Sequence, residues 1–380
     1  MNITPSRSET YFSCPYSYFL KYGLRITEDT LAKFNPLNTG TFLHDLLENI
    51  IGKPGWLEQS EDEIKREAIQ HTQKFFKNIF GEESLPASLE NYARILLNKI
   101  LRLINIFRRE FMQSCFKPVG FEFEISDKGD IQPVCIEISG GEIIIGGKVD
   151  RIDAYISNDK TYLRIIDYKS SDKKLCFSDI YSGTNIQLLC YLYALRENGT
   201  VKFTNPLPAG VEYINIKPKT KELNLKNTKK DCAENFEDNA LFPVIEEENL
   251  ETEGLFLSDI NVLSAMEKEF EGKYIPVKKN ILNAGNMNLN GTENLINTEQ
   301  FEEIFAHIKR IFCIMGESLL KGEINKKPVS ELNSPINKPC RYCMIRDVCE
   351  EKAETCYPQK LAKKDFFELT GEEKPSHEMD

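Results

Sequence analysis

Apolar side chains in the first part of the chain recur at the spacing of amphipathic helices. Helical periodicity is found over residues 8–22, 61–80 and 88–114. A fourth segment, "NTGTFLHDLLENII", begins at Asn38 with small polar residues that can cap a helix. Its apolar positions at helical spacing are Phe42, Leu43, Leu46, Leu47, Ile50 and Ile51. The pattern predicts an N-terminal helical part over residues 1–115.

Beyond residue 115 the apolar period shortens to that of β-strands. Four β-like segments, separated by turn residues, occupy residues 119–125, 134–138, 142–156 and 161–167. Residues 185–197 return to helical spacing, and residues 210–216 form another strand-like run. The change of period predicts an α/β core over residues 116–216.

The chain after residue 216 is less uniform. Residues 217–297 are irregular and rich in Lys, Glu and Asn, which predicts an insertion. Residues 298–360 combine an amphipathic helix with a coil that bears Pro and Cys, and residues 361–380 read as a polar tail. Five segments are therefore expected along the chain.

Charge and composition narrow the class of protein. The chain has 380 residues, a net charge of −11 at pH 7 and 11 cysteines. It lacks both a secretion signal and an apolar run near the roughly 20 residues that cross a bilayer, so we expect a cytoplasmic protein without membrane contact. In that compartment the cysteines would be free thiols or metal ligands. The acidic balance argues against binding nucleic acid over the whole surface, although local basic groups occur at 99–110, 169–174 and 217–230.

Two acids and a lysine stand at the ends of neighbouring strand-like segments. Asp167 and Lys169, in "LRIIDYKSSDK", would share one face of a strand, and the preceding strand reaches Asp150 in "GGKVDRID". If these strands are adjacent, Asp150 and Asp167 could together bind a hard cation such as Mg²⁺. Lys169 could then orient a water or neutralise a phosphate. A surface ion pair on a hairpin is the alternative for the same residues.

Two further side-chain patterns carry possible chemistry. Gln187 and Tyr191 are four residues apart, so on a helix they would share a face and could hydrogen-bond to a phosphate or stack on a base. A helix-surface glutamine beside a core tyrosine would look the same. His44 borders the apolar stripe of its helix, where a histidine is commonly structural.

In order along the chain, "GTFLH", "GGKVDRID", "IIDYKS" and "QLLCY" resemble the RecB-like branch of the PD-(D/E)XK nuclease superfamily. The resemblance implies a restriction-endonuclease-like fold, in which helices flank a mixed central sheet. It implies one active site made of His44, Asp150, Asp167, Lys169, Gln187 and Tyr191. The implied Mg²⁺ ligands are His44, Asp150, Asp167 and the backbone carbonyl of Tyr168. Glu122 or Glu124, on the preceding strand, is a weaker candidate for an outer contact.

The C-terminal coil contains three closely spaced cysteines. Cys340, Cys343 and Cys349, in "PCRYCMIRDVCE", need a fourth ligand to complete a metal or cluster site. Cys356 is a candidate by proximity, and spacing alone suits zinc as well as iron. Cys14, followed by Pro in an aromatic segment, is the better candidate because the combined pattern resembles the iron–sulfur staple of AddB-type nuclease domains. That resemblance favours a structural [4Fe–4S] cluster that ties the N-terminal segment to the C-terminal coil.

The similarity to AddB-type domains extends from "ITPSRSETYFSCPYSYFL" to "LLKGEINKKPV". It implies a Mg²⁺-dependent deoxyribonuclease, an exonuclease acting on a single DNA strand delivered by an AddA-type helicase partner in double-strand-break repair and recombination. Such subunits also carry a helicase-like region, which is not seen here, and no phosphate-cradling G-x-x-x-x-G-K-[ST] loop is found. We therefore expect a fragment or shortened relative that does not hydrolyse ATP. The alternatives are a stand-alone RecB-like nuclease of another pathway, such as CRISPR adaptation, and a non-catalytic scaffold that guides DNA.

Overall fold

The structure is a computed structural model, and it describes residues 1–26, 36–80, 87–169, 173–215, 252–281, 287–329 and 360–372, together with residues 340, 343, 345, 346, 349 and 356. The first part of the predicted insertion, most of the cysteine-bearing coil and the end of the polar tail lie outside the described residues. Among the helices of the described part, none has the length and apolar character needed to cross a membrane.

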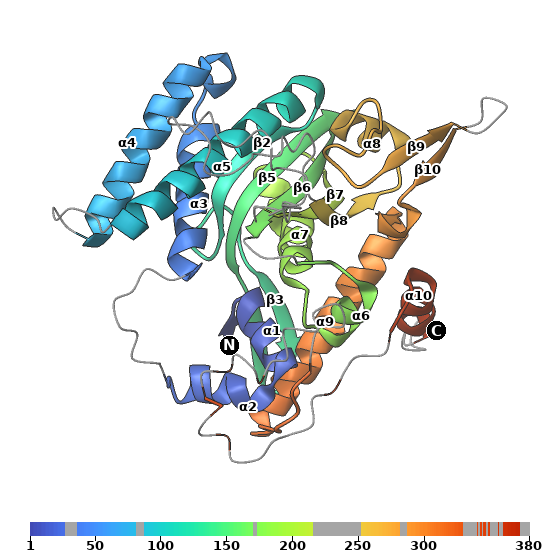
Figure 1. Ribbon diagram of the computed structural model, residues 1–380. Coiled ribbons are helices and arrows are strands. Elements are labelled where there is room, and N and C mark those ends of the chain that lie inside the picture. The colour runs from blue at the N-terminus through green and yellow to red at the C-terminus, as the bar shows by residue number, and fades with distance from the viewer. Residues whose placement is uncertain are drawn as a thin grey trace, which may run out of the picture.

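A six-stranded mixed sheet lies at the centre of the fold (Figure 1). In spatial order its strands are β11 (Leu295–Ile296), β8 (Thr252–Leu257), β7 (Pro206–Asn215), β6 (Lys160–Lys169), β5 (Gly147–Ser157) and β2 (Lys117–Ile125). The pairs β2–β5 and β5–β6 are antiparallel, whereas β6 and β7 run parallel and so need a crossover connection. The crossover contains α6 (Phe177–Ser182), α7 (Gln187–Asn198) and η3 (Gly199–Val201). This mixed sheet with flanking helices confirms the predicted α/β fold.

Two smaller sheets hold the remaining strands. One has the order β1 (Asn2–Ile3), β4 (Gly141–Ile145), β3 (Val134–Ile138), and the other is the hairpin of β9 (Lys278–Ile281) and β10 (Met287–Asn290). The apolar pattern runs continuously over residues 142–156, but the structure divides this stretch at Gly146 into β4 and β5, which belong to different sheets. A Cβ on Gly146 would lie 2.5 Å from the carbonyl oxygen of Ile125. This close backbone approach requires glycine where the chain changes sheet.

A helical lobe covers one face of the central sheet (Figure 1). Its elements are α3 (Pro36–Ile51), η2 (Trp56–Glu58), α4 (Glu61–Phe80) and α5 (Ala87–Gln113). The buried apolar stripe of α3 packs against Ile100, Ile104 and Phe107 of α5. The same apolar cluster includes Ile166 and Tyr168 of β6, so the lobe rests directly on this strand.

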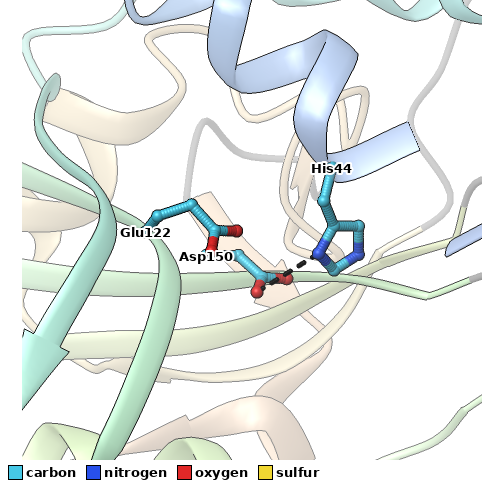
Figure 2. Close-up of side chains that lie close together, drawn as sticks. All are labelled: His44, Glu122 and Asp150. Atoms are coloured by element: carbon cyan, nitrogen blue, oxygen red, sulfur yellow. Dashed lines mark ion pairs between the residues drawn. The ribbon is translucent and has the colours of Figure 1, made fainter. Parts of the chain in front are cut away.

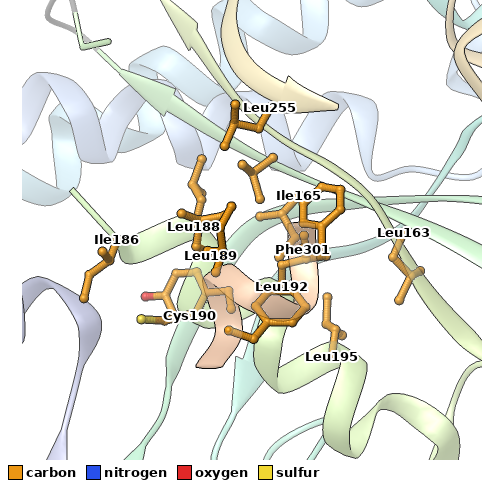
Figure 3. Packing of buried hydrophobic residues seen from close by; sticks show 14 of the residues in the cluster. Leu163, Ile165, Ile186, Leu188, Leu189, Cys190, Leu192, Leu195, Leu255 and Phe301 are labelled. Atoms are coloured by element: carbon orange, nitrogen blue, oxygen red, sulfur yellow. The ribbon is translucent and has the colours of Figure 1, made fainter. Parts of the chain in front are cut away.

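Helices α7 and α9 (Thr298–Leu320) cover the opposite face. Helix α9 begins with a capping box, in which Asn297 and Gln300 exchange side-chain and backbone hydrogen bonds. Figure 3 shows the buried residues of this layer, including Leu188, Leu189, Leu192 and Leu195 of α7 together with Leu163, Ile165, Leu255 and Phe301. Burial of each such side chain contributes roughly 1.5–3 kcal/mol, which fixes α7 against β6. The remaining helices are α8 (Ile260–Met266), η4 (Thr292–Asn294) and α10 (Lys363–Glu372).

The N-terminal helices pack with α7 and α9 rather than with the helical lobe. They are α1 (Pro5–Ser13), α2 (Pro15–Tyr18) and the π-helical turn η1 (Phe19–Gly23). Helix α1 contacts α7, and the ring of Phe12 meets that of Phe312 on α9 edge-on, with centroids 6.2 Å apart. The helical period over residues 8–22 is interrupted at Cys14, whose backbone is extended (φ −167°, ψ 108°). Pro15 explains the break, because a proline disfavours the helical conformation of the residue before it.

Candidate active site

Three elements that are distant in the sequence bring His44, Glu122 and Asp150 together (Figure 2). His44 comes from α3, Glu122 from β2 and Asp150 from β5. One ligand atom of each residue lies within 4.8 Å of the other two, and His44 Nδ1 is 3.4 Å from Asp150 Oδ1. One imidazole nitrogen and two carboxylates at this spacing are suitable donors for a divalent cation.

Glu122 reaches this group through an irregular strand conformation. Strands β2 and β5 pair at Phe121 with Arg151, one position away from Glu122 and Asp150. The φ angle of Glu122 is +45°, in the left-handed region that residues other than glycine rarely adopt. Its Oε2 lies 2.6 Å from Lys148 Nζ. Strained backbone of this kind is concentrated at functional sites, which directs attention to the Glu122 carboxylate.

The other glutamate considered from the sequence, Glu124, is directed elsewhere. Its Oε1 accepts a 2.8 Å hydrogen bond from Ser126 Oγ, and its backbone N–H donates to Asp130 Oδ2. Among the described residues, Glu124 does not belong to the group around His44. Strand alternation places Glu122 and Glu124 on the same face, so the sequence pattern could not separate them.

Asp150 and Asp167, 17 positions apart in the sequence, lie on adjacent antiparallel strands. Asp150 Oδ2 accepts a 3.0 Å hydrogen bond from the backbone N–H of Tyr168, the residue after Asp167. Lys169 Nζ lies 2.6 Å from Asp167 Oδ2. Burial, and next the negative charge of Asp150, raise the pKa of Asp167 to about 6, although Lys169 opposes them. The two carboxylates therefore repel each other, and a bound cation would relieve that repulsion.

His44 presents both ring nitrogens to oxygen atoms. Nε2 lies 3.0 Å from the backbone carbonyl oxygen of Tyr168, and Nδ1 faces Asp150. Burial lowers the pKa of His44, but the hydrogen bond and charge of Asp150 outweigh this effect and bring the pKa to about 9. Positive charge is thus favoured between these oxygens. A divalent cation held by His44, Asp150 and the Tyr168 carbonyl fits that requirement.

Gln187 and Tyr191 lie on the first turns of α7, beside the acids. A hydrogen bond joins their side chains, and burial raises the pKa of Tyr191 above its ordinary value. The charges of Asp167 and Asp150 raise the pKa of Tyr191 further, which shows that Tyr191 is near both. A Cβ on Gly147 would lie 2.7 Å from Tyr191 Oη, so a side chain at the start of β5 would displace this tyrosine. The structure therefore brings the Gln-x-x-x-Tyr pair to the site.

A buried network of charges lies behind the site, and the sequence reasoning missed it. Arg151 makes two hydrogen bonds to Asp153, of 2.7 and 2.6 Å, and a third of 3.2 Å to Tyr168 Oη. Arg164 bonds to Asp153 and to Glu110 of α5, both at 2.7 Å. All these charged side chains are at most 2 % exposed. The network holds the Tyr168 side chain, and so the peptide whose carbonyl faces His44. Buried arginines at alternate positions of two neighbouring strands were the available signal.

The structure also gathers four of the cysteines. Burial raises the pKa of the Cys14 thiol, and the neighbouring thiols of Cys343 and Cys349 raise it further. Burial, followed by the thiols of Cys14, Cys343 and Cys349, likewise raises the pKa of Cys340. Cys356 is not among the neighbours that act on either group. The N-terminal cysteine and the C-x2-C-x5-C motif therefore lie together in space.

Comparison with known proteins gives a family match over nearly the whole chain. The model of the PD-(D/E)XK nuclease superfamily matches residues 2–350. The matched range includes every residue of the acid, lysine, histidine and glutamine–tyrosine motifs described above.

Curated relatives match over a similar range. The chain is 30% identical over 370 residues to an ATP-dependent helicase/deoxyribonuclease subunit of the AddB type from Clostridium acetobutylicum, covering 92% of this chain and 30% of that protein. Proteins of the same name from Clostridium novyi and Acetivibrio thermocellus are 30% and 28% identical over 360 and 354 residues, covering 92% and 91% of this chain and 30% of each protein. The chain spans less than a third of the length of these relatives.

Proposed function

Because the chain belongs to the PD-(D/E)XK nuclease superfamily, we propose that it is a divalent-metal-dependent deoxyribonuclease whose active site lies at the ends of β5 and β6. The observation that carries the proposal is the meeting of His44, Glu122 and Asp150 within one cation's reach, next to the Asp167–Lys169 pair. An isolated surface ion pair would need neither the histidine nor the second and third carboxylates. The arrangement thus supports a nuclease more strongly than it supports a solvated hairpin.

The donors support Mg²⁺ as the metal. His44, Asp150, Asp167 and the Tyr168 carbonyl are the proposed ligands, with Glu122 as an additional carboxylate. Oxygen atoms predominate in this set, as hard divalent cations prefer. When bound, such an ion would polarise the phosphate and lower the pKa of a bound water.

The protein side chains have separable roles in this proposal. Lys169 would stabilise the negative charge that develops on the phosphate, and its 2.6 Å contact with Asp167 holds the ammonium group beside the acids. Gln187 and Tyr191 would bind the DNA strand by hydrogen bonding or stacking from α7. His44 and the Arg151 network would keep the carbonyl of Tyr168 in place.

The names of the relatives support a helicase-coupled role. We propose that the chain acts as an exonuclease on a single DNA strand, together with an AddA-type helicase partner, in double-strand-break repair and recombination. Identity of about 30% across 92% of the chain supports this assignment over a stand-alone nuclease of another pathway. The intact set of acids and lysine argues against a non-catalytic scaffold. A DNA substrate of this kind would place the protein in the cytoplasm of a bacterial cell.

We also propose that Cys14, Cys340, Cys343 and Cys349 bind a structural [4Fe–4S] cluster. A single zinc ion at about 2.3 Å from each sulfur would bring the sulfurs to roughly 4 Å from one another. Among the described residues, the four sulfurs do not form a group that lies within 4.8 Å, although each of Cys14 and Cys340 senses the other thiols. The wider spacing supports a polynuclear cluster rather than one zinc.

Cleavage of linear, end-labelled single-stranded DNA in Mg²⁺ tests the proposed activity. The wild-type chain should shorten the DNA, whereas Lys169→Ala should lower kcat by about a hundredfold or more, since it removes charge stabilisation of the transition state. Lys202→Ala is the matched control, because Lys202 forms the same kind of ion pair, 2.6 Å from Asp130, away from the site. Loss of activity in neither variant, or in both equally, would contradict the proposal.

A further inference from the structure

The first turn of α7 is capped by a side chain from the N-terminal helix α1. The first N–H groups of a helix have no partner within the helix. Ile186, the residue before α7, has no side-chain cap to offer and is 1 % exposed, so water does not replace one. Instead, Glu9 Oε1 accepts hydrogen bonds from the backbone N–H groups of Ile186, at 2.8 Å, and Gln187, at 2.9 Å. Glu9 thus caps a helix that begins 178 residues later.

The negative charge of Glu9 suits this position. Helix α7 has no acidic residue in its first turn, and a carboxylate at a helix N-terminus is favoured by the helix dipole. The second oxygen of Glu9, Oε2, lies 3.6 Å from Lys173 Nζ. Lys173 Nζ and Lys169 Nζ lie 5.4 and 5.6 Å from the centre of the same ring, that of Tyr213. The capping carboxylate is therefore connected, contact by contact, to the lysine of the active site.

Two residues of the proposed DNA-binding pair depend on where α7 begins. Gln187 is the first residue of α7, and its own backbone N–H is one of the two groups that Glu9 accepts. Its side chain is hydrogen-bonded to Tyr191, one turn further along. A displacement of the first turn would therefore move Gln187 directly and Tyr191 through their shared hydrogen bond.

Glu9 is itself held in a fixed position by the packing of α1. The helix is capped at its start by Thr4 and ends next to Cys14. Phe12, one turn after Glu9, is pressed against Gly183 in the turn before α7, where an added Cβ would lie 2.6 Å from the ring. Figure 1 shows α1 beneath the start of α7 and beside α9. Helix α1 thus presents the carboxylate to α7 from a firm base.

We propose that Glu9 is a positioning residue, which fixes Gln187 and Tyr191 for the DNA strand and makes substrate placement dependent on the cysteine-bearing N-terminal segment. This role rests on the proposed nuclease function. It separates two requirements of the site, because Glu9 supports the residues that hold DNA while His44 and Asp150 hold the metal from other elements. Loss of the cap should therefore weaken DNA binding and leave metal affinity intact.

The test compares three variants of the full chain. Glu9→Ala removes the cap, whereas Glu9→Gln keeps an oxygen that can accept both N–H bonds. Asp259→Ala is the matched control, since Asp259 is a half-buried carboxylate that caps α8 through the N–H groups of Asn261 and Val262. KM and kcat are measured with a labelled single-stranded oligonucleotide in Mg²⁺, Mn²⁺ affinity by calorimetry, and stability by thermal unfolding.

Glu9→Ala should raise KM by about tenfold, the effect of losing a cap and its charge, with Mn²⁺ affinity within about twofold of the wild type. Glu9→Gln should restore most of the lost KM, and Asp259→Ala should lower the unfolding temperature without changing KM. The role is overturned if Glu9→Ala and Asp259→Ala have the same KM, or if Glu9→Gln is as impaired as Glu9→Ala. An active wild type with such results would leave the nuclease function standing, whereas an inactive wild type would overturn both.

Discussion

Glu122 illustrates how the backbone conformation of one residue decides what its side chain can bind. Its φ of +45° takes it out of the regular strand, next to Asp150 and His44. Glu124, two positions on, keeps a local hydrogen bond to Ser126 instead. A strained conformation is maintained only when the surrounding structure supports it, and here the pairing of β2 with β5 does so. At the residue scale, Glu122 is therefore the carboxylate we expect to contribute to metal binding.

Substitution of Glu122 should weaken metal binding more than substitution of Glu124. Glu122→Gln removes one negative charge from the group around Asp150 and should lower Mn²⁺ affinity by about tenfold or more, the range seen when residues that support a metal site are lost. Glu124→Gln removes the same charge from the same strand and should leave the affinity within about twofold. Titration calorimetry with Mn²⁺ measures both. Equal affinities for the two variants would remove Glu122 from the site.

At the scale of elements, β6 joins two different environments. Leu163 and Ile165 point to the apolar layer of α7, while Arg164 points to the lobe and is fully buried among acids. Arg164 Nη1 lies 3.3 Å from Glu212 of β7. Burial raises the pKa of Glu212 to about 8, with Glu110 adding to the shift and Arg164 opposing it. A neutral Glu212 leaves the two buried arginines balanced by two carboxylates, which is the less costly arrangement in a buried site.

This balance predicts a dependence of stability on pH. The pKa of Glu212 in the folded chain lies above its ordinary 4.5, so its contribution to stability is complete below about pH 4.5 and is lost as pH rises through about 8. The free energy of unfolding should therefore fall by about 1 kcal/mol or more between pH 5 and 9. Urea unfolding at several pH values should show a smaller fall for Glu212→Gln. Glu197→Gln, on the exposed surface of α7, should behave like the wild type, and an unchanged pH dependence in Glu212→Gln would contradict the assignment.

Periodicity predicted most elements of the fold, because helices and strands that bury one face carry that pattern in their sequence. It identified the stripe of α3 and the strands that bear Asp150 and Asp167. It could not find the division at Gly146 or the cap by Glu9, which depend on contacts between residues distant in the sequence. The register that brings Glu122 to Asp150 was also out of reach, since alternation specifies a face and not a partner strand. The four cysteines were grouped by resemblance, and their neighbourhood in space agrees with that grouping.

At the scale of the whole molecule, contacts between the two ends of the chain complete the fold. Ser13 accepts a 2.7 Å hydrogen bond from the backbone N–H of Val329, and Lys326 Nζ lies 5.0 Å from the centre of the Tyr16 ring. Cys14 and the C-terminal cysteines meet in the same region. A link that closes so long a loop restricts the unfolded chain strongly, in theory. We therefore expect the cysteine site to stabilise the whole molecule and, through α1 and Glu9, the start of α7.

Removal of one proposed cluster ligand should have both a spectroscopic and a thermodynamic effect. Anaerobically purified wild type should absorb near 400 nm, roughly where thiolate-bound iron–sulfur clusters absorb. Cys349→Ser should lose this absorbance and unfold at a lower temperature, because the link between the chain ends is lost. Cys135→Ser, at an exposed cysteine on β3, should keep both properties. A colourless wild type that contains zinc would contradict the cluster.

The central claim, that His44, Glu122 and Asp150 hold a divalent cation, is tested most directly by anomalous diffraction from crystals containing Mn²⁺. The account predicts an anomalous peak between these three side chains, with Asp150 oxygen at about 2.1–2.2 Å, and loss of that peak in Asp150→Asn. A peak elsewhere with none at this group, in crystals whose chain cleaves DNA, would contradict it.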